Sequence, residues 1–169
     1  ERCSPVSGGA WSSTATGPTR AASSCEVKVN ILVFSDSHGE TGTMFTAVET
    51  YCPEAVIHLG DYVSDARALA SRFGDIPLHS VAGNGDFLSK TVDEAVFEIK
   101  GHKLFCTHGH RYYVKNGYQN VRRAGAKAGA DIVLFGHTHI PCSLKLPGLI
   151  LANPGSAGGR DPTFGMLSL

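Results

Sequence analysis

Five short polar clusters stand out in the sequence, and their residue types are those that bind divalent metal ions. The clusters are Asp36-Ser-His38, Gly60-Asp61, Gly83-Asn84-Gly-Asp86, Thr107-His108-Gly-His110 and Gly136-His137-Thr-His139. Together they hold five of the eight histidines of the chain. Imidazole, carboxylate and amide oxygen ligands suit hard to borderline divalent ions. Because the clusters supply more donors than one ion with open substrate positions would use, we expect two ions bridged by a carboxylate.

The spacing within the clusters gives a geometric reason for this expectation. In an extended segment, two residues separated by one point the same way, so the pairs D-x-H and H-x-H can each reach a common ion. Glycines directly before Asp61, Asn84 and His137 allow sharp turns close to the ligands. Two ions about 3.5–4 Å apart lower the pKa of a bridging water and clamp phosphate oxygens. Such a site needs no nucleophilic side chain, and the chain has no G-x-S-x-G segment.

Each cluster directly follows a segment that reads as a β-strand. The five strands are predicted at Val27–Phe34, Ala55–Leu59, Ile76–Ala82, Lys103–Thr107 and Asp131–Phe135. Their β-branched and aliphatic runs are typical of strands buried on both faces. In open α/β sheets, ligands bind beyond the carboxyl ends of the strands. We therefore expect the five loops to converge on one site.

The remaining pattern predicts an α/β fold with two packed mixed β-sheets flanked by helices. Helices are expected around Met44–Tyr51, near Asp65–Phe73, and along Tyr118, Val121 and Gly125. The second half contains hairpin signals, first around Gly101-His102 and then around Pro147-Gly148. A last strand is expected at Thr163–Leu169. About nine strands result.

Composition limits the domain organisation and the kind of partner. Residues 1–26 are rich in Ser, Thr, Gly and Ala without a helical or strand period, which predicts a flexible tail before a single domain at residues 27–169. Fifteen basic residues balance fifteen acidic ones, which argues against a nucleic-acid polymer as partner. Five cysteines without a C-x-x-C pair fit neither a disulfide framework nor a sulfur-ligated zinc site. No stretch has the length of a membrane span, so we expect a cytoplasmic protein.

The ordered set D-S-H, G-D, G-N-G-D, T-H-G-H and G-H-T-H resembles the calcineurin-like metallophosphoesterase superfamily, in particular its small bacterial and archaeal phosphodiesterase branch. The resemblance covers about residues 28–169, and Asn153-Pro-Gly-Ser156 resembles a signature near the C-terminal end of that branch. It implies a four-layer metallophosphoesterase sandwich. The implied activity is hydrolysis of small phosphodiesters through attack of a bridging metal-bound hydroxide.

The resemblance also implies roles for individual residues. It assigns Asp36, His38 and His139 as ligands of one ion. It assigns Asn84, His108 and His137 as ligands of the other ion, and Asp61 as the carboxylate that bridges the two. Asn84 would also contact the substrate phosphate, and Asp86 and His110 match positions that support catalysis. Ligand chemistry favours Mn²⁺ as the cofactor, with Ni²⁺, Fe, Co²⁺ or Zn²⁺ as alternatives. The branch also suggests association into homo-oligomers.

One position departs from the wider superfamily. Many members carry a histidine within G-N-H-[DE] that can protonate the leaving oxygen, whereas this chain has Gly85. Poor leaving groups benefit most from a general acid. We therefore expect a preference for diesters with good leaving groups over monoesters, unless His110 supplies the proton.

Two other functions remain alternatives. The retromer subunit of the same fold is mainly a protein-interaction scaffold, with degraded first and third motifs; D-S-H and G-N are intact here, which favours catalysis. A phosphomonoesterase or protein phosphatase ranks lower, because G-N-H-[DE] is missing.

Overall fold

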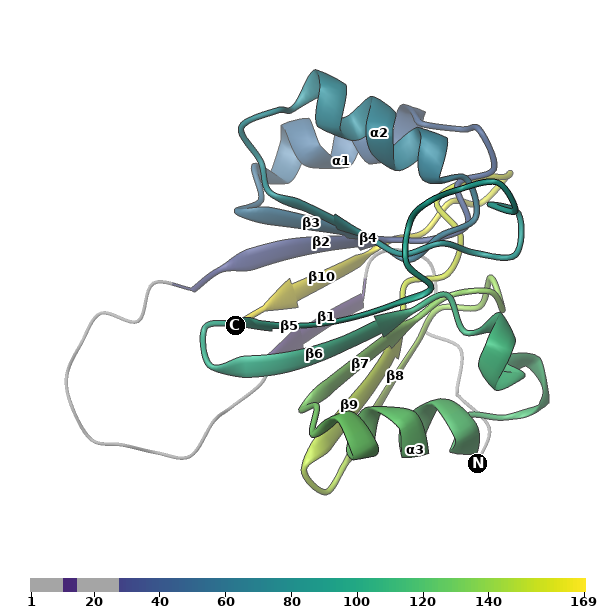
Figure 1. The fold of residues 1–169 in the computed structure, drawn as a ribbon. Helices are drawn as coiled ribbons and strands as arrows, with labels where there is room; N and C mark the ends of the chain where they lie inside the picture. The colour runs from purple at the N-terminus through teal and green to yellow at the C-terminus, as the bar shows by residue number, and fades with distance from the viewer. Residues whose placement is uncertain (1–10, 15–27) are drawn as a thin grey trace, which may run out of the picture.

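The computed structural model describes residues 11–14 and 28–169, which form two five-stranded mixed sheets packed face to face (Figure 1). The first sheet has the order β1 (Trp11–Thr14), β10 (Gly165–Ser168), β2 (Asn30–Phe34), β3 (Ala55–His58) and β4 (Leu78–Ser80). The second has the order β5 (Glu94–Ile99), β6 (His102–Thr107), β7 (Ile132–Phe135), β9 (Leu149–Asn153) and β8 (Cys142–Leu146).

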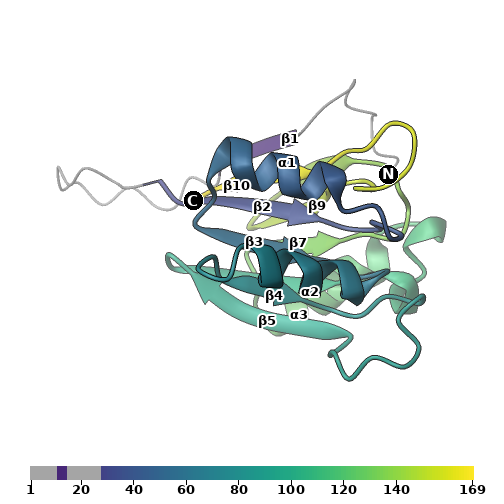
Figure 2. The ribbon, with the colours of Figure 1, turned by 90° about the horizontal axis from the view of Figure 1, so that it is seen from above.

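Helices cover the outer face of each sheet. Helices α1 (Gly42–Tyr51) and α2 (Val63–Arg72) lie on the first sheet, and α3 (Gln119–Ala128) lies on the second (Figure 1). Figure 2, seen from above, places α1 and α2 side by side over β2, β3 and β4. This is the expected four-layer α/β sandwich, so the predicted fold class is confirmed.

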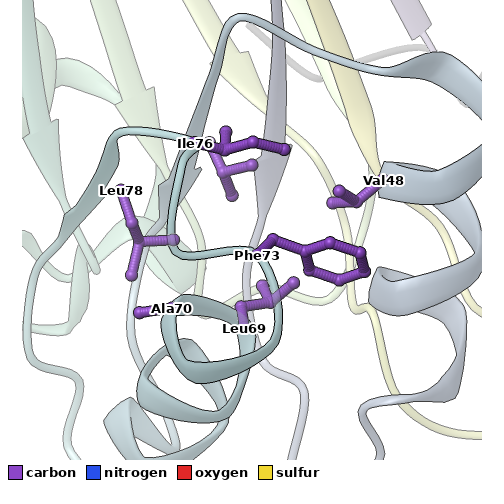
Figure 3. Close-up of a pocket in the computed structure, with 7 residues that line it drawn as sticks. Val48, Leu69, Ala70, Phe73, Ile76 and Leu78 are labelled. Carbon is purple, nitrogen blue, oxygen red and sulfur yellow. The ribbon is translucent and has the colours of Figure 1, made fainter.

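The central strands are continuously apolar because both of their faces are buried. In β2, Ile31 and Val33 pack in the cluster between the two sheets, whereas Leu32 and Phe34 pack under α1 and α2. Strand β7 divides in the same way between the inter-sheet core and the layer under α3. An apolar gap between α1 and α2, lined by Val48 and other apolar side chains, belongs to this packing (Figure 3). It contains none of the predicted site residues.

Several element boundaries differ from the prediction. Helix α2 begins at Val63 rather than near Asp65. The first hairpin turns at Lys100 and Gly101 rather than at Gly101 and His102, with φ of 52° and 78°. Two left-handed residues in succession match a type I′ turn, whose twist suits antiparallel strands. Two short 3₁₀ helices, His110–Tyr112 and Val114–Asn116, were not anticipated.

The segment predicted as a flexible tail holds one described element. Within residues 1–26, Trp11–Thr14 forms β1, which adds in parallel to the free edge of β10. An edge strand can pair through its backbone without any sequence period, which explains why composition did not indicate it. The rest of that segment lies outside the described residues, and the domain boundary at residue 27 stays a prediction.

The topology brings the predicted polar loops to one end of both sheets. Strands β2, β3 and β4 are parallel, as are β6 and β7, so their carboxyl ends share an edge. Backbone hydrogen bonds join neighbouring loops: the amide of Asp36 donates to Gly60 O and that of Gly136 to His108 O, each at 3.0 Å. Across residues 11–14 and 28–169, no helix combines the length and apolar character that crossing a bilayer requires.

Candidate metal centre

Six of the seven predicted ligands gather into two groups at this end of the sheets. We call Asp36, His38 and His139 the outer group, because both histidines are exposed, and Asp61, His108 and His137 the inner group, because Asp61 and His108 are buried. Within each group the ligand atoms lie within 4.8 Å of one another. Loops from both sheets therefore contribute to both groups.

In the outer group, the ligand nitrogen and oxygen atoms face one another and have few other hydrogen-bond partners. Nε2 of His38 lies 3.4 Å from Nε2 of His139, which lies 3.2 Å from Oδ1 of Asp36. Asp36 is fully buried, yet its Oδ1 accepts no hydrogen bond. An unpaired buried carboxylate oxygen is unfavourable unless a cation is nearby. This orphaned oxygen fits a bound metal ion.

The inner group shows the same arrangement around His108. Its Nδ1 donates to the carbonyl of Leu59 at 2.9 Å, which leaves the lone pair of a neutral ring on Nε2. That Nε2 lies 3.1 Å from Nδ1 of His137, 3.2 Å from Oδ1 of Asn84 and 3.5 Å from Oδ2 of Asp61. Lone pairs that point at one another repel unless a cation lies between them. The predicted second ion therefore fits these residues, with Asn84 as a further oxygen donor.

Asp36 connects the two groups. Its Oδ1 lies 3.2 Å from Nε2 of His139 in the outer group and 3.8 Å from Nε2 of His108 in the inner group. The bridging role was predicted for Asp61, whose carboxylate contacts His108. The assignment of the bridge to Asp61 remains a prediction.

The ligand loops have a left-handed backbone, not the extended one on which the spacing argument relied. Five ligands have positive φ: Asp36 54°, His38 50°, Asp61 51°, His137 69° and His139 59°. The left-handed region costs a residue with a β-carbon roughly 1 kcal/mol. Such strain collects at functional sites, where the surrounding structure enforces it. The H-x-H pair is divided between the groups, His137 in the inner and His139 in the outer, whereas Asp36 and His38 of the D-x-H pair both lie in the outer group.

Two glycines are required by how closely the loops approach. A β-carbon at Gly136 would overlap Oγ of Ser35, and one at Gly83 would overlap Oδ1 of Asp61. Both clashes involve groups that hold or contain a ligand carboxylate. The glycines of G-H-T-H and G-N-G-D thus permit close packing against the metal ligands.

Hydrogen bonds orient both carboxylates. Oδ2 of Asp36 accepts from the amide of His137 at 2.9 Å and from Oγ of Ser35 at 2.6 Å. Oδ1 of Asp61 accepts from the amide of Gly85 at 2.7 Å. Each carboxylate is therefore fixed through one oxygen while the other faces the histidines. Such supporting contacts tune metal affinity.

His58, to which the sequence assigned no role, is part of this support. It is fully buried; Nδ1 accepts from the amide of Gly60 at 3.3 Å, and Nε2 lies 3.1 Å from Oγ of Ser37. That hydroxyl is 3.4 Å from the carbonyl of Asp61. Burial lowers the pKa of His58 to about 4, so the ring is neutral at pH 7. His58 thereby connects the loop of the outer group to the loop that carries Asp61.

Asn153 and Ser156 support two of the ligand loops. Nδ2 of Asn153 donates to the carbonyl of Gly136 at 2.9 Å and to Oγ1 of Thr138 at 3.0 Å. Ser156 donates from Oγ to the carbonyl of Asp36 at 2.7 Å. The resemblance in N-P-G-S marked this segment, but only the structure shows that it holds the ligand loops.

Asp86 and His110 occupy different surroundings from the ligands. Both oxygens of Asp86 accept backbone amides, Oδ1 from Val63 at 2.7 Å and Oδ2 from Gly83 at 2.9 Å. The ring of His110 lies 5.4 Å from that of His108 and 6.1 Å from that of His137, and its buried Nδ1 has no hydrogen-bond partner. Asp86 therefore holds two loops in place, whereas His110 faces the inner group with a free ring nitrogen.

His137 of the inner group and the neighbouring His110 have lowered pKa values, which favour the neutral form that metal ligation requires. Burial, followed by the neighbouring His108, lowers the pKa of His137 to about 4. Burial also lowers the pKa of His110, and His108 and Arg111 add to this effect. Neutral imidazole leaves a nitrogen lone pair available for a metal ion.

The family profile of the calcineurin-like phosphoesterase superfamily domain matches residues 29–169. YsnB of Bacillus subtilis strain 168, named a probable metallophosphoesterase, is 35% identical over 130 residues, 76% of this chain and 75% of its own. The phosphodiesterase MJ0936 of Methanocaldococcus jannaschii is 29% identical over 162 residues, 82% of this chain and 92% of its own. A crystal structure of a protein from Streptococcus pneumoniae TIGR4, described as a predicted phosphoesterase, superposes with a TM-score of 0.71 at 28% identity, covering 84% of this chain and 83% of that one.

The chain therefore belongs to the calcineurin-like phosphoesterase superfamily. It is similar to small bacterial and archaeal metallophosphoesterases, as its motifs predicted, and it carries two Asp/His groups consistent with a binuclear metal site.

Proposed function

We propose that the chain is a metal-dependent phosphodiesterase that hydrolyses small diesters at a two-ion site. The observation that supports this most strongly is the pair of ligand groups joined through Asp36, in which lone pairs converge without donors. The name of the relative MJ0936, a phosphodiesterase, agrees with this reaction.

The proposed ligands are those that the resemblance implies. Asp36, His38 and His139 would hold one ion, Asn84, His108 and His137 would hold the other, and Asp61 is the proposed bridging carboxylate. Two bound divalent ions supply Lewis acidity, which lowers the pKa of water and offsets the charge on the phosphate. The side chains keep both ions in place and exclude competing donors. Asn84, which is exposed beside the inner group, is suited to contact a phosphate oxygen as well.

The proposed preference for diesters rests on the proton that the leaving group needs. Gly85 donates its amide to Asp61 and carries no side chain that could act as an acid. His110 is the one candidate acid among the predicted residues, and its lowered pKa leaves it mostly neutral at pH 7. Esters with good leaving groups depend least on such an acid.

Mn²⁺ is the proposed cofactor, because the ligands combine several imidazoles with carboxylate and amide oxygens. The octahedral, water-rich coordination of Mg²⁺ suits such a donor set less well. Ni²⁺, Fe, Co²⁺ and Zn²⁺ are the alternatives that metal replacement would compare.

A direct test uses the purified chain, first stripped with chelator and then reloaded with Mn²⁺. We expect faster cleavage of bis-p-nitrophenyl phosphate than of p-nitrophenyl phosphate, and loss of both activities with EDTA. Asp61→Ala should reduce turnover to background, whereas Asp75→Asn, at an exposed position after α2, should leave it unchanged. A faster monoesterase would overturn the diester preference. A protein that binds no Mn²⁺ and cleaves neither ester would favour the scaffold alternative.

A further inference from the structure

Large apolar side chains that are exposed to solvent lie beside the ligand residues. Tyr62 follows Asp61 directly and is 43% exposed, and Ile140 follows His139 and is 53% exposed. Phe87 and Leu88, both 93% exposed, come shortly after Asn84. Exposed apolar residues that gather in one region mark binding surfaces more often than isolated ones do.

Tyr62 occupies a position that gives the fold no benefit. It is the N-cap of α2, where Ser, Thr, Asp or Asn would stabilise the helix, and it makes no capping hydrogen bond. Its φ of 76° is unfavourable for a side chain of this size. The capping role is taken by Asp86, whose Oδ1 accepts the amide of Val63. A strained, exposed aromatic residue that caps nothing points to a function outside stability.

The ring of Tyr62 is placed against the outer group. Its centroid lies 5.5 Å from that of His38, with the two planes at 71°. This edge-to-face contact is a favourable geometry for aromatic pairs and fixes the ring at the border of the site. Because Tyr62 is 43% exposed, part of its side chain is open to solvent next to a predicted metal ligand.

Phe87 and Leu88 are presented from the neighbouring loop. The loop is closed at its base by the amide of Ala82, which donates to Val92 O at 2.8 Å. Its other anchor is the amide of Val63, which donates to Oδ1 of Asp86, so Tyr62 and Phe87 each directly adjoin one end of the same hydrogen bond. The ring of Tyr62 therefore borders the site, and the nearly fully exposed Phe87 and Leu88 belong to the loop that is bonded to the residue after Tyr62.

We propose that Tyr62, together with Phe87 and Leu88, forms a subsite for an aromatic organic group of the substrate, such as an aryl or nucleobase substituent on the phosphorus ester. This inference rests on the proposed function and names the class of substrate that the same site prefers. With phosphate at the ions, the substituent next to His38 stacks on the exposed part of the Tyr62 side chain. Base or aryl stacking of this kind changes affinity by about tenfold.

The test measures binding without turnover. Calorimetry with the Mn²⁺-loaded protein compares phenylphosphonate with methylphosphonate, neither of which can be hydrolysed as an ester. We expect the phenyl compound to bind about tenfold more tightly than the methyl compound. Tyr62→Ala should remove this preference for the phenyl compound, whereas Tyr62→Phe should keep it. Phe87→Ser should reduce the preference for the phenyl compound by less than Tyr62→Ala does.

Tyr113→Ala is the matched control. Tyr113 is also an exposed tyrosine with a left-handed backbone, 68% exposed with φ of 53°, but no ring contact with a ligand histidine is among those described. Its replacement should leave the phenyl preference intact.

The outcomes separate this subsite from the proposed function. If diesters are cleaved and methylphosphonate binds, but Tyr62→Ala retains the phenyl preference, the subsite is wrong and the phosphodiesterase stands. If neither phosphonate binds the Mn²⁺-loaded protein and no ester is cleaved, both fail. If light scattering shows that Phe87→Ser converts an oligomer into a monomer without changing the preference, these side chains contact a second copy of the chain instead, and the subsite is overturned.

Discussion

The inner and outer ligand groups differ in how firmly the protein holds them. His108 of the inner group has a fully buried side chain, and its ring is fixed by a 2.9 Å hydrogen bond to the carbonyl of Leu59. His139 of the outer group has a side chain that is 47% exposed, and its described polar neighbours are ligands of the same group. A hydrogen bond to the backbone therefore anchors His108 of the inner group, whereas His139 of the outer group has no such bond among its described contacts.

This difference predicts unequal metal affinities. A ligand whose other ring nitrogen is hydrogen bonded loses little freedom when it binds a metal, and removal of such a supporting partner costs about 10- to 100-fold in affinity. We expect the inner ion to bind first and more tightly. The outer ion, at the open side of the centre, should exchange more readily and lie closer to the Tyr62 ring.

The largest effect is expected from removing an inner ligand. His108→Ala should lower turnover of bis-p-nitrophenyl phosphate by more than about 100-fold and release the tight ion, since it removes both a ligand and its anchor. His38→Ala should retain one ion per chain after dialysis, as measured by elemental analysis. Equal metal loss in the two variants would contradict the distinction between the groups.

His58 contacts the loop of Asp36 and His38 and the loop of Asp61, and its contribution to the free energy of unfolding should depend on pH. The folded pKa of about 4 is below the ordinary value of 6.5, so the unfolded chain binds the proton more readily. The free energy of unfolding should therefore decrease by about 3 kcal/mol through this residue as the pH falls from 6.5 to 4. Above pH 6.5 this residue should cause no such change.

Denaturant unfolding of the metal-free protein across this range measures the effect. His58→Gln should show a shallower loss of stability towards low pH than the unsubstituted chain. His102→Gln, at the β5–β6 hairpin, serves as the control. Parallel pH profiles for the unsubstituted chain and His58→Gln would show that burial of this ring does not control acid sensitivity.

Replacing Asn153 should weaken metal binding by a smaller factor, and it should do so equally for the inner and the outer group. Asn153 holds the loop that carries both His137 and His139, so Asn153→Ala should weaken both ions by about tenfold. Stepwise Mn²⁺ titration would report the two affinities. Asn116→Ala, at the exposed last residue of the second 3₁₀ helix, controls for loss of an asparagine. Weakening of one ion alone would mean that the loop does not move as a unit.

The sequence predicted much of the fold and site, but for partly different reasons from those that the structure shows. Apolar runs such as Ile31–Phe34 indicate buried strands because burial on both faces leaves no polar position. The division of ligands came from the family resemblance and stays a prediction; the structure places Asp61, the predicted bridge, in the inner group. The spacing predicted extended pairs, but these backbones are left-handed; Asp36 and His38 still lie in one group, whereas His137 and His139 lie in different groups.

Other features depend on contacts between distant segments, which no local pattern encodes. His58 has the same local signal as any strand histidine, and its role comes from Ser37, 21 residues away. Asp86 matches a motif position that the resemblance assigned to support of the ligands or the substrate, and the structure shows that its carboxylate accepts amides of two loops. The strain at Tyr62 likewise becomes visible only from its φ.

The central claim is that the two groups hold two ions close enough to act on one phosphate. Electron paramagnetic resonance of the protein loaded with two equivalents of Mn²⁺ tests it directly. Ions about 3.5–4 Å apart are exchange coupled, so we predict a coupled spectrum that appears only when the second equivalent binds. Asp61→Ala should abolish it. Two independent six-line signals, or saturation at one ion per chain, would contradict a binuclear centre.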